Sequence, residues 1–309
     1  MYYNNVLEII GNTPMVKINQ LTNESDATVL AKLEMLNPRG SVKDRIAKYM
    51  IENAEKRGSL KPDSIIVEPT TGNTGIALAM VSTVKNYKMI AVMPEGMSEE
   101  REKMIKAFGA DVLFTPNSGE ADAKLAINKA EQISKENPKV FLPNQFKNVD
   151  NVLAHRETTG KEVLNQGGEN IDAFVAGTGT GGTLVGVAQT LKEKIPNVKI
   201  IAVEPAGSPI LSGGKPGYHK IQGIGEGFIP EVLKSGLNLI DEIITVTDYE
   251  AIDMTRRLAK EEGILVGISS GANMFAALKV AKKLGKDKTI VTIFPDGGER
   301  YLSDDVFKK

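Results

Sequence analysis

The chain has 309 residues, of which 41% are hydrophobic and 25% charged, a composition typical of a soluble globular protein with one large core or two domains. Its 38 basic and 39 acidic residues leave a net charge of −1, which gives no sign of a nucleic-acid or membrane surface. The absence of cysteine excludes disulfides, thiolate catalysis and cysteine-ligated metals, and the two histidines, His155 and His219, disfavour a histidine-rich metal site or triad.

The N-terminal sequence has neither the basic region nor the apolar core of a signal peptide. No apolar run approaches the roughly 20 residues that span a bilayer. We therefore expect a cytoplasmic protein.

The first predicted helix carries a candidate for chemistry. The apolar run 28–36 predicts a buried strand, and Pro and Gly in 37–40 indicate a turn. Ser41 is expected to be the N-cap of the next helix and Gly58 to end it. Lys43 then falls in the first helical turn, where the macrodipole lowers the pKa of an amine, as a nucleophilic lysine requires. A solvated lysine at a helix end is the alternative.

After this helix, short β-rich runs alternate with helical patterns to the end of the chain. This rhythm predicts an α/β fold in which helices cover both faces of parallel sheet. The segment 205–230 is rich in Gly and Pro, has no regular period and is too long for a plain connection, so we expect a functional loop. Strands are expected at 64–68, 89–93, 111–115, 140–142, 171–176, 198–203, 243–246 and 289–294, and helices at 76–85, from 98, at 120–136, at 149–166, from 184 to about 195, at 249–262 and at 272–284.

Polar, glycine-bounded loops follow several predicted strands, which is where open α/β sheets bind ligands. The loop 177–183 matches the Gly-x-Gly-x-x-Gly pattern, and Glu204 lies near the acidic position of a dinucleotide site. Taken alone, this loop leaves NAD, another phosphate ligand and a structural turn open. No dinucleotide site requires the loop 70–75, for which an ordinary turn capped by Thr74 is the alternative, and the loop 267–271 places the hydroxyls of Ser269 and Ser270 at a strand end. Together with Lys43 they fit a cofactor with one phosphate, one aromatic ring and one aldehyde, which describes pyridoxal 5′-phosphate.

A set of motifs occurs in an order typical of one enzyme family: Pro38-x-x-Ser41-Val-Lys43-Asp-Arg45, Glu68-Pro-Thr-Thr-Gly-Asn-Thr-Gly75, Pro143-Asn-Gln-Phe146, Gly179-Thr-Gly-Gly-Thr183, Gln222-Gly-Ile-Gly225 and Gly267-Ile-Ser-Ser-Gly271. The set resembles cysteine synthase (O-acetylserine sulfhydrylase), a family that includes cystathionine β-synthase. The resemblance extends from Ile10 to Tyr301. A nicotinamide oxidoreductase and a non-catalytic binding module are the competing classes.

The resemblance implies the fold of tryptophan synthase β, which is fold type II of the pyridoxal-phosphate enzymes. This fold has two three-layer αβα domains with mostly parallel sheets. The implied smaller, mobile domain is 35–148, and the larger is 1–34 with 149–309. The cofactor is expected in the cleft between them, and the protein is expected to be a homodimer. The C-terminal tail of serine acetyltransferase, which binds in the active-site cleft of cysteine synthases, is the implied partner.

The resemblance also implies the roles of individual residues. Lys43 is implied to form an imine with the cofactor aldehyde and to act as the base at Cα. Asn73 contacts the pyridoxal 3′-oxygen and Ser269 the pyridine nitrogen. The implied phosphate loop is Gly179, Thr180, Gly181, Gly182 and Thr183. The implied substrate-binding residues are Thr70, Thr71, Gly72, Gln145, Gly223 and Gly225.

A serine facing the pyridine nitrogen indicates the type of reaction. A hydroxyl is not acidic enough to keep that nitrogen protonated, so the ring is a weaker electron sink than one that faces Asp. This favours loss of a Cβ leaving group over transamination or racemisation. The implied activity is ping-pong β-replacement through an aminoacrylate, in which O-acetyl-L-serine and sulfide give L-cysteine and acetate.

Two positions depart from the family pattern. Thr71 replaces the usual Ser and keeps the hydroxyl, which we interpret as a mild change. Glu226 stands where cysteine synthases have Ala and cystathionine β-synthases have Tyr. If it faces the pocket, its carboxylate repels hydrosulfide by about 1–4 kcal/mol at about 4 Å, and it attracts an ammonium group or acts as a base.

The alternative function that Glu226 raises is β-replacement with L-cysteine as first substrate and release of hydrogen sulfide. A second cysteine then gives lanthionine, homocysteine gives cystathionine, and water gives serine. If Glu226 points to solvent, the expectation is a plain cysteine synthase.

Overall fold

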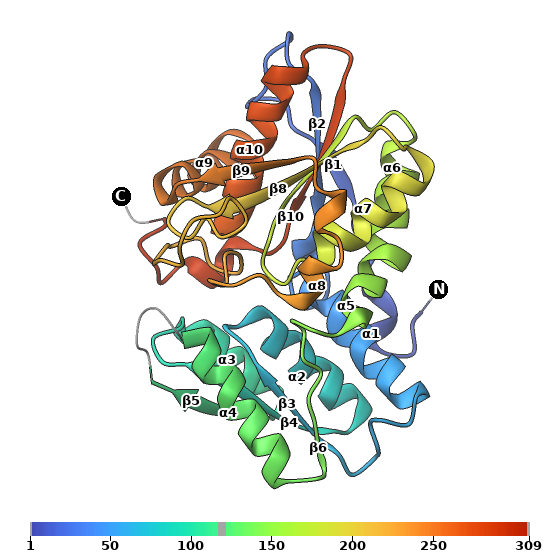
Figure 1. Ribbon diagram of the computed structural model, residues 1–309, viewed down its shortest axis with the longest axis vertical. Coiled ribbons are helices and arrows are strands. Elements are labelled where there is room, and N and C mark those ends of the chain that lie inside the picture. Colours follow the sequence, from blue (N-terminus) through green and yellow to red (C-terminus); the bar gives the residue numbers. More distant parts are fainter. Residues whose placement is uncertain (1, 117–121, 308–309) are drawn as a thin grey trace.

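Two sheets of mainly parallel strands form the frame of the protein, and the larger lies above the smaller in Figure 1. The computed structural model describes residues 2–116 and 122–307. All described strand pairs are parallel except β1 with β2. The larger sheet has the order β1 (Met15–Lys17), β2 (Thr28–Leu33), β10 (Thr289–Phe294), β7 (Ala173–Gly177), β8 (Lys199–Pro205), β9 (Glu242–Val246). The smaller has the order β5 (Asp111–Thr115), β4 (Lys88–Pro94), β3 (Ile65–Pro69), β6 (Val140–Phe141).

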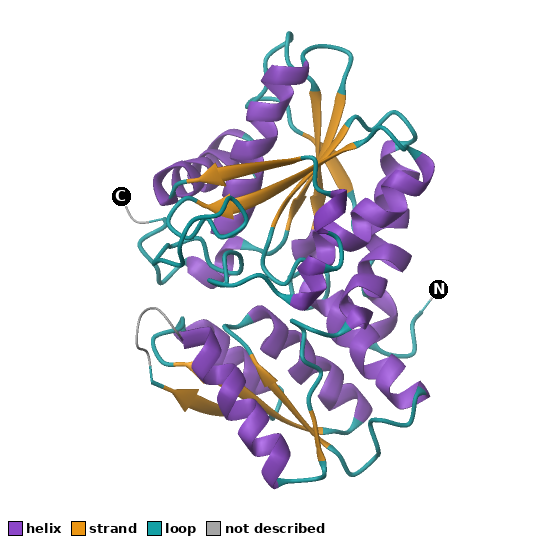
Figure 2. Ribbon diagram, in the orientation of Figure 1, coloured by secondary structure: helices purple, strands orange, loops and turns teal. Residues whose placement is uncertain are grey.

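Helices cover both faces of each sheet, so the predicted αβα layering is confirmed (Figure 2). Alternate residues of β7 show the two faces: Ala173 and Val175 pack in one core cluster, and Phe174 and Ala176 in another. On the larger sheet, α9 (Asp248–Glu261) and α10 (Ile268–Leu284) cover one face and α6 (Lys161–Gly167) and α7 (Gly182–Lys194) the other. On the smaller sheet, α4 (Asp122–Glu136) covers one face and α1 (Lys43–Lys56), α2 (Asn73–Lys85) and α3 (Glu99–Ala107) the other.

Some helix starts differ from the sequence predictions. The prediction that Ser41 is the N-cap of α1 is wrong, because Val42 takes that position and the Ser41 hydroxyl accepts the N–H of Lys43 at 3.3 Å. Gly58, with φ +70°, ends the helix as predicted. α2 and α10 begin three and four residues before the predicted starts (73 against 76, 268 against 272), so part of each polar loop is a first helical turn. The predicted start of the next helix at residue 120 lies outside the described residues.

The predicted helical segment 149–166 is interrupted in its middle. It consists of α5 (Val149–Ala154), a π-helical turn (His155–Gly160) and α6. Single π-helical turns inside helices occur frequently at functional sites. The turn packs closely against α7, the helix that follows the glycine loop of the larger sheet.

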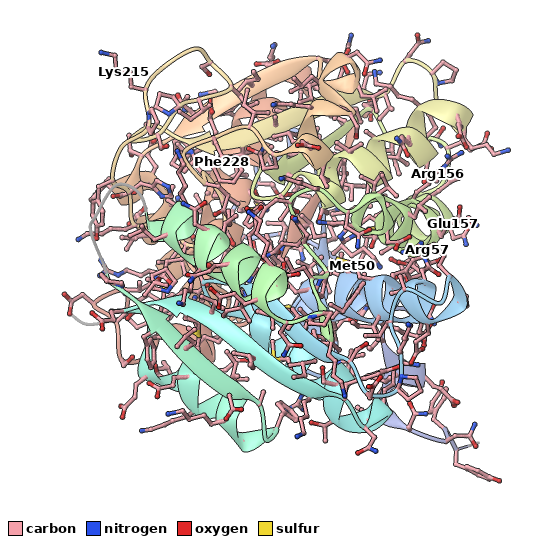
Figure 3. The ribbon with its side chains drawn as sticks, turned by 60° about the horizontal axis from the view of Figure 1, so that its bottom comes forward. Met50, Arg57, Arg156, Glu157, Lys215 and Phe228 are labelled. Carbon is pink, nitrogen blue, oxygen red and sulfur yellow. The ribbon has the colours of Figure 1, made fainter. Side chains whose placement is uncertain are left out.

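The segment predicted as an irregular loop, 205–230, contains neither helix nor strand beyond Pro205, the last residue of β8, and is followed by α8 (Glu231–Lys234). The end of this segment is bonded to the loop that follows β7, because the N–H of Gly225 donates to the Thr178 carbonyl at 3.0 Å. Lys215 projects outward from it, whereas Phe228 packs edge-on against Phe146 at 5.5 Å (Figure 3). No helix among the described residues has the length and apolar character needed to cross a bilayer.

Candidate active site

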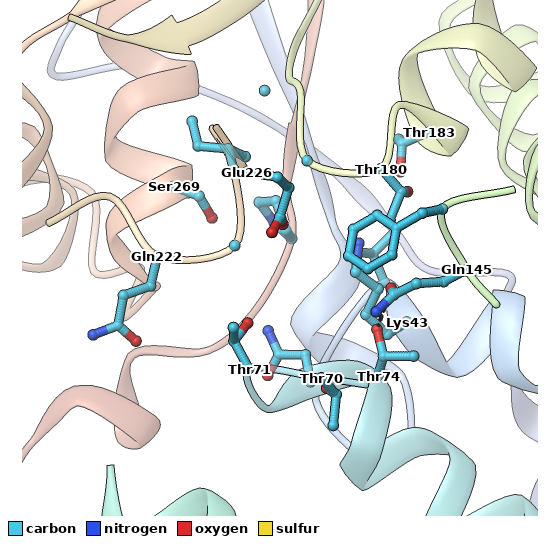
Figure 4. A pocket seen from close by; sticks show the side chains of 18 of the residues that line it. Lys43, Thr70, Thr71, Thr74, Gln145, Thr180, Thr183, Gln222, Glu226 and Ser269 are labelled. Atoms are coloured by element: carbon cyan, nitrogen blue, oxygen red, sulfur yellow. Dashed lines mark hydrogen bonds between the residues drawn. The ribbon is translucent and has the colours of Figure 1, made fainter. Parts of the chain in front are cut away.

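A pocket between the two sheets collects most of the residues that the sequence singled out (Figure 4). Both sheets contribute the carboxyl ends of their strands and the helix starts that follow them. The predicted residues that line it are Lys43, Thr70, Thr71, Asn73, Gln145, Gly179, Thr180, Gly181, Thr183, Gly223, Glu226 and Ser269.

The remaining predicted glycines, Gly72, Gly182 and Gly225, shape the loops behind the lining. Gly72 has φ +150° and donates its N–H to Thr70 Oγ1 at 3.0 Å. A side chain at Gly182 would overlap the Asn151 amide. These glycines therefore act through backbone geometry.

Lys43 is the first residue of α1 and extends into the pocket. Burial lowers the pKa of its amine, and the negative charges of Glu226 and Asp296 partly oppose this shift. An amine with a lowered pKa spends more time unprotonated, which nucleophilic and base chemistry both require.

A buried ion cluster holds the start of α1 in place. Arg45 is 2% exposed, and its Nε lies 2.6 Å from Glu34 Oε2 in the turn after β2. Its Nη1 lies 2.6 Å from Glu162 Oε1 in α6, and Lys32 Nζ lies 2.9 Å from Glu162 Oε2. The cluster joins three elements two residues from Lys43 and so fixes the direction from which its side chain enters the pocket.

Asn73 is oriented by a carboxylate from the other sheet. Its Nδ2 donates to Asp296 Oδ2 at 2.7 Å, and the Tyr301 hydroxyl donates to the same oxygen at 2.8 Å. Burial, with the Asp296 charge, raises the pKa of Tyr301, so its hydroxyl stays protonated and donates. The Asn73 Oδ1 atom is buried and has no hydrogen-bond partner among the described residues. A polar group bound in the pocket would satisfy it.

The loop after β3 is tied to Gln145. Thr70 Oγ1 accepts the N–H of Gly75 at 3.1 Å, and Thr74 donates its hydroxyl to Gln145 Oε1 at 2.7 Å. Glu68, at the end of β3, accepts the backbone N–H of Gln145 at 3.0 Å. Burial raises the pKa of Glu68 to about 7. These bonds bring polar groups of two loops together at one side of the pocket.

The glycine loop at the start of α7 forms a cradle for an anion. Gly181 is left-handed (φ +89°), which turns the backbone into the helix N-terminus. Thr183 in the first turn lies 3.2 Å, Oγ1 to Nε2, from His155, whose Nδ1 is 2.9 Å from Thr159 Oγ1. Burial lowers the pKa of His155 well below its usual value, so the ring is neutral and supports Thr183.

Glu204, the acidic residue of the dinucleotide interpretation, lies in the strand next to this cradle, but its carboxylate is bound by the segment that follows. Its carboxylate accepts the N–H groups of Leu211 at 2.8 Å and Ser212 at 2.9 Å. It therefore closes a turn of the segment 205–230, and the geometry does not favour a nicotinamide site.

Glu226 faces the pocket, so the solvent-exposed orientation considered from the sequence is wrong. Burial raises the pKa of its carboxyl, which the positive charge of Lys43 opposes. A Cβ added at Gly179 would lie 3.6 Å from Glu226 Oε1, so the carboxylate lies beside the first residue of the glycine loop. A partly buried carboxyl with a raised pKa is suited to proton transfer near neutral pH.

Sequence reasoning gave no role to three residues of this site: Arg101, Asp296 and Tyr301. Asp296 and Tyr301 lie in the C-terminal sequence Phe294-Pro-Asp-Gly-Gly-Glu-Arg-Tyr301, whose match to the family was the available signal. Arg101 lies among glutamates at the start of α3, a pattern that indicates an exposed helix. The structure places Arg101 and Tyr301 in the pocket lining and Asp296 behind it.

Comparison with known proteins gives consistent matches over almost the whole chain. The family model described as pyridoxal-phosphate dependent enzyme matches residues 6–296. A cysteine synthase of Staphylococcus aureus is 53% identical over 304 residues, which are 98% of this chain and 96% of the relative. Two solved structures are similar as well. A hydrogen sulfide-producing enzyme of Fusobacterium nucleatum has 47% identity, a TM-score of 0.93, and coverage of 97% of this chain and 100% of that one. A cysteine synthase of Entamoeba histolytica has 43% identity, a TM-score of 0.94, and coverage of 100% and 92%.

Proposed function

The chain belongs to the pyridoxal-phosphate dependent enzymes, and from that premise we propose that it is a cysteine synthase, which converts O-acetyl-L-serine and sulfide into L-cysteine and acetate. The observation that carries the proposal is Lys43, a buried amine with a lowered pKa that enters the pocket from a helix start. Identity of 50–53% to cysteine synthases over 98% of the chain supports the same activity.

The residues of the pocket fit pyridoxal phosphate. The cradle 179–183 is suited to the phosphate, and Lys43 supplies an amine for the aldehyde. Ser269 lies in the first turn of α10 and is 4% exposed, so its hydroxyl requires a polar partner such as the ring nitrogen. The unsatisfied Asn73 Oδ1 is a second polar atom that such a ring would meet.

The protein groups have separate tasks in the proposed reaction. When bound, the cofactor withdraws electrons from Cα of the amino acid and so promotes loss of the Cβ substituent. Thr70, Thr71 and Gln145 hold the substrate carboxylate, and Lys43 Nζ removes the Cα proton as acetate departs. Sulfide then bonds to Cβ, and Lys43 returns the proton to Cα.

Glu226 supports a second candidate function, in which L-cysteine is the first substrate and hydrogen sulfide is released. Its carboxylate lines the pocket and interacts with Lys43. A negative charge there opposes hydrosulfide and favours the ammonium group of a second amino acid. Lanthionine, cystathionine or serine are the products according to the nucleophile. The similar Fusobacterium nucleatum enzyme produces hydrogen sulfide, which is consistent with this candidate.

Replacing Glu226 decides between the two candidates. Under the second candidate, Glu226→Gln lowers the steady-state release of hydrogen sulfide from cysteine by at least about 10-fold, because the attacking thiol or water loses the base that accepts its proton and a second amino acid loses the charge that attracts its ammonium group. The rate of Glu226→Gln with O-acetylserine and sulfide equals or exceeds that of the wild type, because the variant no longer repels hydrosulfide. Both rates are measured by following the products with mass spectrometry. Glu226→Ala is the second variant, and Glu231→Gln, on the exposed start of α8, is the control. Unchanged rates in both Glu226 variants would reject the second candidate.

We also propose a cytoplasmic homodimer in which 35–148 closes over bound substrate, as the family resemblance implies. The pocket between two separate sheets is consistent with such closure. Serine acetyltransferase is the proposed partner, through a C-terminal tail that enters the same pocket. A pull-down with a tail peptide tests this interaction in wild type and Glu226→Ala.

A further inference from the structure

Arg101 reaches from the smaller sheet's helices to the opposite wall of the pocket. It lies in α3, which packs beside α2 and β5, and it is 3% exposed. Its Nη1 donates to the Thr71 carbonyl at 3.4 Å and to Oε1 of Gln222. The first partner belongs to the loop 70–75, and the second begins the loop 222–226. One guanidinium therefore joins two loops that are far apart in the sequence.

The Arg101 side chain is packed between Gly72 and the Tyr301 ring. Gly72, at φ +150°, lies against the side chain of Arg101, and a Cβ added to Gly72 would overlap that side chain. On the other side, the guanidinium carbon lies 5.2 Å from the centre of the Tyr301 ring, a cation–π contact. Tyr301 and Asn73 share Asp296 Oδ2. Arg101 thus contacts the loop 70–75 directly at Thr71 and reaches Asn73 of the same loop through Tyr301 and Asp296.

The partners of Arg101 are suited to a contact that forms and breaks. Its direct partners are a carbonyl, a side-chain amide oxygen and an aromatic ring, which hold a guanidinium less strongly than a bonded carboxylate does. The charge of Arg101 also acts on the carboxylate of Asp304, which accepts a hydrogen bond from Gln222. Its Nε is buried and makes no hydrogen bond within the described residues. The Arg101 side chain therefore keeps one buried donor that a further polar partner would satisfy.

We propose that Arg101 is a positioning residue that couples the loop 70–75 to the loop 222–226. Closing the first loop on a substrate carboxylate is then transmitted through the guanidinium to Gln222, and so fixes the position of Glu226, which lines the pocket. The coupling sets an order of events, because the wall that meets the second substrate is fixed in position only after the first substrate is held. The inference rests on the proposed function for its substrate but not for its contacts.

Amide hydrogen exchange of the holoenzyme tests the coupling between the two loops without any substrate present. In the holoenzyme, Arg101→Ala is expected to raise amide exchange in both 70–75 and 222–227. Lys103→Ala, an exposed position of the same helix, leaves both unchanged. Unchanged exchange at 222–227 in Arg101→Ala would overturn the proposal. A variant that exchanges rapidly throughout the chain points instead to a folding role and also overturns it.

Kinetics supply a second readout. Arg101→Ala is expected to lower kcat/KM for O-acetyl-L-serine by about 10- to 100-fold, the effect of losing hydrogen bonds from a charged donor. The visible absorption of bound cofactor is kept. Arg101→Lys recovers part of the loss, because an ammonium reaches one acceptor but not both. In a double-mutant cycle, adding Gln222→Ala to Arg101→Ala causes little further loss, and fully additive losses contradict the coupling. If the wild type does not consume O-acetylserine, the proposed function fails while the exchange experiment still tests Arg101.

Discussion

Replacing Lys43 by alanine is expected to lower kcat by about 10³-fold or more, because one amine both reacts with the cofactor aldehyde and moves the Cα proton. The position supports this expectation: the amine is buried, its pKa is lowered, and it lies near Glu226 and Asp296. Steady-state turnover of O-acetyl-L-serine with sulfide is the measurement. The loss is expected in kcat, since other residues hold the substrate carboxylate.

Lys56→Ala is the matched control, because Lys56 is the exposed last residue of the same helix. It is expected to keep wild-type turnover. Thermal unfolding of both variants separates a chemical loss from a folding defect. Turnover within 10-fold of wild type in Lys43→Ala would show that the reacting amine lies elsewhere.

Replacing Arg45 by alanine is expected to cost about 3–5 kcal/mol of unfolding free energy, because it leaves the fully buried carboxylate of Glu34 without its cation. Urea unfolding of the holoenzyme measures the loss. Arg257→Ala is the control. Arg257 and Glu261 form an exposed i, i+4 ion pair, so a loss of at most about 0.5 kcal/mol of unfolding free energy is expected.

The Arg45 cluster also predicts an acid dependence. Burial alone would raise the pKa of Glu162, but Arg45 and Lys32 outweigh it and lower the value to about 2. A folded-state pKa below the unfolded value gives stability that is present above about pH 4.5. This contribution disappears as the pH falls toward 2. The gap between wild type and Arg45→Ala should therefore narrow over that range, and a gap independent of pH contradicts the cluster's role.

Local patterns predict most of this fold because its strands are short apolar or alternating runs between turn residues. The strands 111–115 and 289–294 occur at their expected bounds, since a short apolar run between turn residues leaves few alternatives. The start of α10 was less predictable. Ser269 and Ser270 have side chains typical of caps and turns, yet they lie in the first turn because Gly267 takes the N-cap.

The site residues that belong to sequence motifs could be predicted. The direction of a side chain that depends on the conformation of a loop could not. Lys43, Asn73 and the cradle 179–183 meet in the pocket as their motifs indicate. The direction of Glu226 depends on left-handed glycines on either side of it, Gly225 and Gly227, which local patterns do not define. Arg101 could not be found among its acidic neighbours, because its role arises from contacts across the two sheets.

Borohydride reduction of the holoenzyme, followed by proteolysis and mass spectrometry, tests the central claim most directly. We expect the pyridoxyl group on the peptide that contains Lys43 and no such label in the digest of Lys43→Ala. A label on a different lysine, or no label on a protein that retains full turnover, would contradict it.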